Sequence, residues 1–125
     1  PLQLLFPNAK FWISRRALER AKNPHVRDRA SFIPELAPLL EASGRLKIIE
    51  GSGVFPFHPK ISFRESQGHT PGMLIVRAEN TYLPTDLIPG VPWVNLPITT
   101  SFDRFPELSI DEKKNLLEEV VENDG

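Results

Sequence analysis

One histidine and one aspartate, each beside a turn, are the residues of this chain best suited to metal chemistry. His69 lies in the sequence Gly-His-Thr-Pro-Gly at positions 68–72, directly before the apolar run 73–76, and Asp86 follows the next short extended segment. Neutral imidazole and carboxylate oxygen are good zinc ligands, with bond lengths of about 2.0 to 2.2 Å. The pair predicts part of a metal site, because two ligands do not complete one.

The segments around this pair predict a β-meander. Strands are expected at residues 60–65, 73–78 and 81–84, with a tight turn at 79–80 between the last two. Since the third strand then runs antiparallel to the second, Asp86 is expected at the same end of the sheet as His69. Two plainer interpretations stay open: His69 as an ordinary turn histidine, and Asp86 as a residue that hydrogen-bonds the turn that follows it.

The N-terminal part of the chain predicts alternating strands and helices. A strand at residues 9–13 leads into a helix with Ser14 as its N-cap, and this helix continues to about Lys22. A helical turn is expected at 26–30, and a second helix from Pro34 to a C-terminal cap at Gly44. The apolar residues from Leu46 to Ile49 predict another strand, which should end in a turn at 50–53.

The C-terminal part predicts a long loop and one helix. Prolines between residues 88 and 106 discourage regular helix, so Trp93 and Phe102 are expected on an ordered loop, where they either line a cleft or anchor the loop. Asp103 and Arg104 form a surface pair in the simplest interpretation. The segment Ser109–Glu112 has the capping-box pattern of a helix start, and the helix has an apolar stripe formed by Leu116, Leu117, Val120 and Val121.

Composition indicates a soluble globular segment, which we treat as a single partial domain over residues 1–125. The chain has 125 residues, 40% hydrophobic content and a formal net charge of -1. It contains no cysteine, which excludes disulfides, thiolate ligands and cysteine nucleophiles. No apolar run approaches the roughly 18 residues of a membrane span. We therefore expect a cytoplasmic protein with no membrane partner.

The charges are unevenly distributed. Residues 1–30 hold seven Lys or Arg against two acids, whereas residues 101–125 hold eight acids against three Lys or Arg. A basic face for a phosphate-rich partner is one interpretation. Two solvated helices of opposite sign are the favoured one, because no aromatic residues interleave the basic positions as nucleic-acid stacking requires. A nucleic-acid partner is therefore not expected.

At this point the motifs resemble a known family. Their order along nearly the whole chain looks like the middle and later part of a metallo-β-lactamase-fold hydrolase. The segments that carry this resemblance are Phe6-Pro7-Asn8-Ala9, Arg15-Arg16, Arg27-Asp28-Arg29-Ala30-Ser31, Gly44-Arg45-Leu46, Gly68-His69-Thr70-Pro71-Gly72 and Thr85-Asp86-Leu87-Ile88-Pro89. The resemblance implies an α/β fold, the αββα metallo-β-lactamase-like sandwich, which is incomplete in this chain.

The resemblance also implies a site and a function. His69 would be a metal ligand and Asp86 the carboxylate that bridges two zinc ions, while metal-bound water would attack an ester, lactone, amide or related small-molecule substrate. Gly68 and Gly72 would let the backbone turn sharply. Thr85 departs from the family's usual glycine and, as a β-branched residue, disfavours a positive backbone φ.

The family's upstream cluster, His-x-His-x-Asp-His, does not occur in these residues. We therefore expect the isolated chain to bind divalent metal poorly and to hydrolyse nothing efficiently, whether it is a fragment or a truncated relative. A non-catalytic interaction module is the alternative, and a nuclease-type relative is a weaker one. An incomplete sandwich would leave an apolar sheet face and an unpaired edge, so partial unfolding or self-association is also expected.

Overall fold

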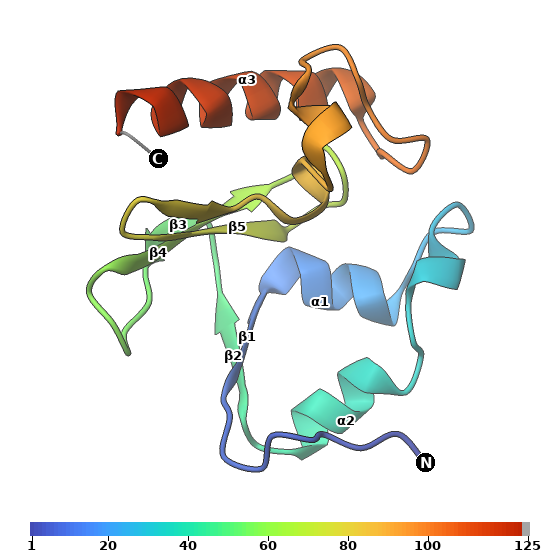
Figure 1. Ribbon diagram of the computed structural model, residues 1–125. Coiled ribbons are helices and arrows are strands. Elements are labelled where there is room, and N and C mark those ends of the chain that lie inside the picture. Colours follow the sequence, from blue (N-terminus) through green and yellow to red (C-terminus); the bar gives the residue numbers. More distant parts are fainter. Residues whose placement is uncertain (124–125) are drawn as a thin grey trace. The chain divides into compact units, whose positions relative to one another are not determined.

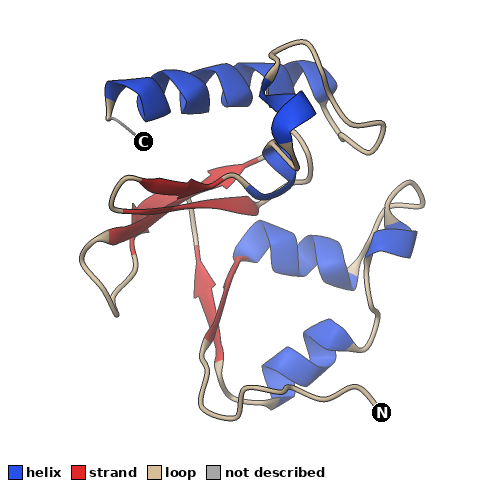
Figure 2. Cartoon of the chain, in the orientation of Figure 1, coloured by secondary structure: helices blue, strands red, loops and turns tan. Residues whose placement is uncertain are grey.

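The computed structural model describes residues 1–123. These residues form an α/β chain that divides into two compact units, one over Pro1–Glu50 and one that begins at Gly51 (Figures 1 and 2). None of the helices within residues 1–123 has both the length and the apolar character that crossing a bilayer requires.

The first unit contains two parallel strands and two helices. Its elements are β1 (Phe11–Ser14), α1 (Arg15–Lys22), a 3₁₀ turn (Arg29–Ser31), α2 (Leu36–Ala42) and β2 (Leu46–Ile49). β1 pairs with β2 in parallel, with Phe11 opposite Leu46. The predicted N-cap is confirmed, because the Ser14 hydroxyl accepts a hydrogen bond from the Ala17 amide at 2.9 Å.

Three basic residues of this unit are paired with acids. Arg20 donates twice to the Asp28 carboxylate, at 2.6 and 2.8 Å, and Lys22 donates to Glu41 at 3.0 Å. Arg15 bonds to Glu50. These pairs favour the interpretation of the N-terminal charges as solvated, locally neutralised helices over a free basic face.

The second unit is a four-stranded antiparallel sheet with one long helix. The strands are β3 (Ser52–Val54), β4 (Ile61–Ser66), β5 (Met73–Ala78) and β6 (Thr81–Leu83), and they pair in that order. Two 3₁₀ turns (Thr85–Leu87 and Val91–Val94) and α3 (Pro106–Glu122) follow. The predicted meander of β4, β5 and β6 is confirmed.

The core of this unit lies between the sheet and α3. Ile75, Leu87 and Leu116 are buried together, and the residues packed against them are Met73, Tyr82, Ile88 and Val120. Burial of such side chains is the main favourable contribution to folding. The predicted stripe on the last helix is correct in part, because Leu116 is at its centre but Val121 is 78% exposed.

Several predicted boundaries are wrong, and α2, for example, begins at Leu36 rather than at Pro34. The turn expected at 50–53 contains only Gly51 in a left-handed conformation, and Ser52 already pairs with Arg64 as the first residue of β3. The last helix begins at Pro106 rather than at Ser109. Proline suits this first helical position because its missing N–H has no intrahelical partner there, so it starts this helix instead of preventing it.

Candidate functional site

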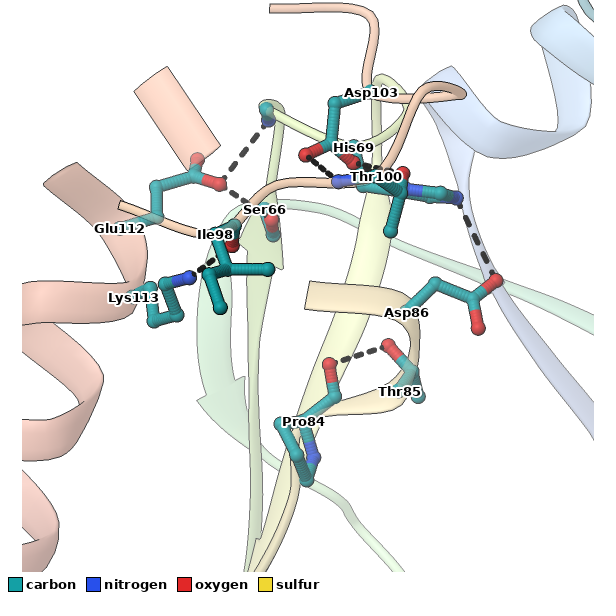
Figure 3. Close-up of polar contacts among 11 residues, drawn as sticks. Ser66, His69, Pro84, Thr85, Asp86, Ile98, Thr100, Asp103, Glu112 and Lys113 are labelled. Atoms are coloured by element: carbon teal, nitrogen blue, oxygen red, sulfur yellow. Dashed lines mark hydrogen bonds and ion pairs between the residues drawn. The ribbon is translucent and has the colours of Figure 1, made fainter. Parts of the chain in front are cut away.

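The two residues predicted to bind metal lie next to each other. His69 is in the turn that joins β4 to β5, and Asp86 is in the 3₁₀ turn after β6. Because β5 and β6 are antiparallel, both turns lie at one end of the sheet. His69 Nε2 lies 3.5 Å from Asp86 Oδ2 (Figure 3). The predicted proximity is confirmed, and the role of either residue as a metal ligand stays a prediction.

The other ring nitrogen of His69 faces a second carboxylate, which sequence reasoning missed. His69 Nδ1 lies 2.8 Å from Asp103 Oδ1, and the Asp103 side chain is only 4% exposed. The interpretation of Asp103 as part of a surface pair is therefore wrong. Its spacing of three from Thr100 is typical of a turn closed by a side chain, but nothing in that local signal indicates contact with His69.

Thr100 holds the Asp103 carboxylate in place. Its hydroxyl donates to Asp103 Oδ1 at 2.8 Å, and its amide donates to Oδ2 at 3.2 Å. In both contacts a carboxylate oxygen of Asp103 is the acceptor. Figure 3 shows the Asp103 carboxylate in contact with both Thr100 and the His69 ring. The side chains therefore form a row in the order Thr100, Asp103, His69 and Asp86.

Glu112 of α3 holds the start of the same turn. Its carboxylate accepts hydrogen bonds from the Ser66 hydroxyl at 2.5 Å, from the Gln67 amide at 2.7 Å and from the Gly68 amide at 3.1 Å. The capping-box pattern had assigned Glu112 to the start of its own helix. Instead the side chain binds amides of a different segment, because the helix begins one turn earlier.

The loop before α3 is bonded along the backbone of the turn. The Arg104 amide donates to the His69 carbonyl at 3.0 Å, and the Phe105 amide donates to the Gly68 carbonyl at 2.8 Å. At the end of the turn the Gly72 amide donates to Gln67 Oε1 at 3.0 Å. The backbone on both sides of His69 is therefore held by hydrogen bonds from the loop before α3 and from the Gln67 side chain.

The two glycines of the turn serve different purposes. Gly72 has φ +82°, a conformation that a residue with Cβ adopts at a cost, so its predicted role in a sharp turn is confirmed. Gly68 has no positive φ. A Cβ at Gly68 would lie 2.5 Å from the Ser109 amide nitrogen and 2.6 Å from its Cα. Gly68 therefore lets α3 approach the turn closely, which is a tertiary requirement.

Lys113 anchors the proline-rich loop to α3. Its side chain is 1% exposed, and its ammonium group donates to the Asn95 carbonyl at 3.0 Å. It also donates to the Ile98 carbonyl at 2.6 Å, as Figure 3 shows. Burial lowers the pKa of Lys113, and the charge of Asp103 partly opposes that shift. Phe102 is 73% exposed, so it does not anchor the loop. The anchoring cation lies on the helix that had been interpreted as acidic and solvated.

Thr85 adopts the positive backbone φ that its side chain disfavours. Its φ is +51°, directly before Asp86. Replacement of Thr85 with glycine is expected to raise the free energy of unfolding by about 0.5 to 1 kcal/mol, since relief of left-handed strain exceeds the added flexibility of the unfolded chain. Urea unfolding measures the difference. The matched control, Thr81→Gly in β6, should lower the free energy of unfolding. If Thr85→Gly also lowers it, the backbone at Thr85 is not strained.

The described residues contain half of a metal site at most. Within residues 1–123 no group of three or more His, Asp or Glu side chains is placed to hold one ion. The pair of His69 and Asp86 nevertheless offers an imidazole nitrogen and a carboxylate oxygen that is 67% exposed. These are donor types that zinc accepts. The described residues therefore offer at most this pair of ligand atoms to one ion.

Comparisons by sequence and by structure give different results. No protein-family model matches the chain, and no curated protein is significantly similar to it in sequence. A probable metal-dependent hydrolase from Staphylococcus aureus superposes with a TM-score of 0.80 and 21% identity, over 95% of this chain and 43% of that one.

Two further solved structures superpose with a TM-score of 0.69. AidC, a dizinc quorum-quenching lactonase in complex with a product, is 24% identical over 94% of this chain and 46% of that one. An N-acyl homoserine lactone hydrolase, with the product N-hexanoyl-L-homoserine bound at its catalytic metal centre, is 21% identical over 95% of this chain and 45% of that one. The chain thus spans less than half the length of each of these structures.

Proposed function

We propose, from the metallo-β-lactamase fold that this chain shares with those hydrolases over nearly its whole length, that it is part of a metal-dependent hydrolase. In this proposal the metal is zinc, and His69 and Asp86 supply two of the ligands. The substrate class is a small ester, lactone, amide or related molecule. Lactones are favoured within that class because two of the similar structures are lactone hydrolases.

The observation that carries the proposal is the placement of His69 and Asp86. The 3.5 Å between Nε2 and Oδ2 is longer than a good hydrogen bond, and the two atoms belong to separate turns that face each other. Bound zinc polarises an oxygen of the substrate and lowers the pKa of a water molecule toward 7. The residues of this chain would contribute orientation: His69 is held on Nδ1 by Asp103, and Asp86 stays open to solvent.

Zinc binding by the chain itself is the first test. Zinc sites in proteins usually have four ligands, so the 125-residue chain should bind zinc weakly through these two residues. In an isothermal titration, His69→Gln and Asp86→Asn should each weaken binding at least tenfold, which corresponds to about 1.4 kcal/mol. The matched controls are His58→Gln and Asp111→Asn, which should change the affinity less than twofold, because both residues lie outside the site.

Two outcomes would oppose the proposal. Variants of His69 and Asp86 that bind zinc as the natural chain does would remove both residues from the site. Tight binding of two zinc equivalents, with turnover of an ester or lactone, would show that the chain is not the incomplete site described above. Circular dichroism of each variant establishes that it is folded before its affinity is interpreted.

An interaction module without catalysis is the second candidate, and it is favoured by the absence of a three-ligand cluster within the described residues. Fusing the chain to a segment that carries the family's histidine cluster separates the two candidates. Zinc-dependent hydrolysis by the fusion supports the hydrolase, and a folded fusion without it supports the module. The nuclease-type alternative is disfavoured because Arg20, Lys22 and Arg15 are already paired with acids.

A further inference from the structure

We infer that Asp103 is a positioning residue that fixes the proton of His69 on Nδ1 and thereby leaves the lone pair of Nε2 directed at Asp86. This inference rests on the proposed function, because the free lone pair of Nε2 has a use only if His69 binds a metal. The tautomer itself is a property of the chain without metal, and it can be measured without metal.

Distances decide which nitrogen carries the proton. A neutral imidazole has one donor nitrogen and one acceptor nitrogen. His69 Nδ1 lies 2.8 Å from Asp103 Oδ1, within the ordinary range for a hydrogen bond, whereas Nε2 lies 3.5 Å from Asp86 Oδ2. A proton on Nδ1 makes a short bond to a carboxylate, and a proton on Nε2 makes none of comparable length. The Nδ1–H tautomer is therefore the more stable one.

The surroundings of the two carboxylates reinforce this choice. Asp103 is 4% exposed and Asp86 is 67% exposed, so the contact with Asp103 is shielded and that with Asp86 competes with water. Thr100 donates to both oxygens of Asp103, which keeps that side chain an acceptor. A proton on Nδ1 of His69 gives this acceptor a further hydrogen bond, at Oδ1.

The Nδ1–H tautomer matters because a metal binds the nitrogen that lacks a proton. With Asp103 on Nδ1, the lone pair of Nε2 is available, and it lies on the side of the ring that faces Asp86. Metal-binding histidines commonly donate their other N–H to a carboxylate, which fixes the ring and the tautomer. Asp103 performs this positioning before any ion is bound.

Nitrogen NMR of the natural chain tests the inference directly. In a ¹⁵N-histidine-labelled sample at about pH 8.5, where an unperturbed imidazole is neutral, His69 should show a protonated Nδ1 and an unprotonated Nε2. Signals are assigned with His25→Gln and His58→Gln. If His69 of the natural chain carries its proton on Nε2, the inference is wrong, and no Asp103 variant is needed to show it.

Two further substitutions separate the carboxylates. Asp103→Asn presents an amide that can donate to Nδ1, so the proton should move largely to Nε2, and Asp86→Asn should leave it on Nδ1. Asp111→Asn is the control for removal of a surface carboxylate and should change nothing. A shift with Asp86→Asn and none with Asp103→Asn would overturn the inference.

Zinc distinguishes this inference from the proposed function. If the natural chain has the Nδ1–H tautomer and its Nε2 signal shifts on addition of zinc chloride, both stand. If the tautomer is as expected and zinc leaves Nε2 unchanged, the positioning role of Asp103 stands and the metal role of His69 fails.

Discussion

Gly68→Ala is expected to destabilise the chain by about 3 kcal/mol. The new Cβ would lie 2.5 Å from the Ser109 amide nitrogen and 2.6 Å from its Cα, so either α3 or the turn that carries His69 must move. Overpacking of this kind usually costs about 1 to 3 kcal/mol. The upper end is expected here because the opposing atoms belong to helix backbone. Urea unfolding of the two proteins gives the difference, and measurement at several concentrations removes any contribution from self-association.

Two companion variants identify the cause. Gly53→Ala is the matched control, because Gly53 has no positive φ and a Cβ there would lie 3.4 Å from the Phe63 ring. It should cost much less than Gly68→Ala. Ser109→Gly added to Gly68→Ala should restore little, since two of the three closest atoms are backbone atoms. Full restoration, or a loss below about 0.5 kcal/mol in the single variant, would contradict the close approach.

Lys113→Met has the second-largest expected effect, a loss of about 2 kcal/mol. Methionine keeps most of the apolar stem but removes the donor that the Asn95 and Ile98 carbonyls share. Buried acceptors left without partners cost about 1 to 3 kcal/mol, and the relief of burying a charge offsets part of that cost. The control is Lys114→Met on the exposed side of the same helix, which should change stability by less than about 0.5 kcal/mol. Equal losses from both variants would contradict the anchoring role.

The same lysine predicts a pH dependence of stability. Burial lowers the pKa of Lys113 in the folded chain, so between that lowered value and the unfolded value of about 10.4 the unfolded chain binds more protons. Stability contributed by this group therefore rises with pH across that window. The difference in unfolding free energy between the natural chain and Lys113→Met should grow as the pH rises toward about 10.4. A difference that shrinks over this range would show that the ammonium form is the one the fold favours.

Local sequence signals predicted most of the elements, because each depends on neighbours in the chain. The Ser14 N-cap, the C-terminal cap at Gly44 and the strand over residues 73–78 follow from hydrogen bonds and periodicity that are set within a few residues. The α/β metallo-β-lactamase fold class is confirmed by structural superposition. The strand β3 was missed because Ser52 and Gly53 have low β-propensity, and only pairing with β4 makes them a strand.

The sequence by itself determined that His69 and Asp86 lie at one end of a meander, since antiparallel strands with tight turns leave no other place for them. It did not determine what surrounds them. The contact of Asp103 with His69, the binding of turn amides by Glu112 and the loop anchored by Lys113 join residues 15 to 46 positions apart. Such contacts depend on how α3 packs on the sheet. The spacing and periodicity of residues along the sequence do not specify how closely a helix and a sheet approach each other. Tertiary structure alone therefore decided that one histidine of an ordinary-looking turn is held on both its backbone and its ring.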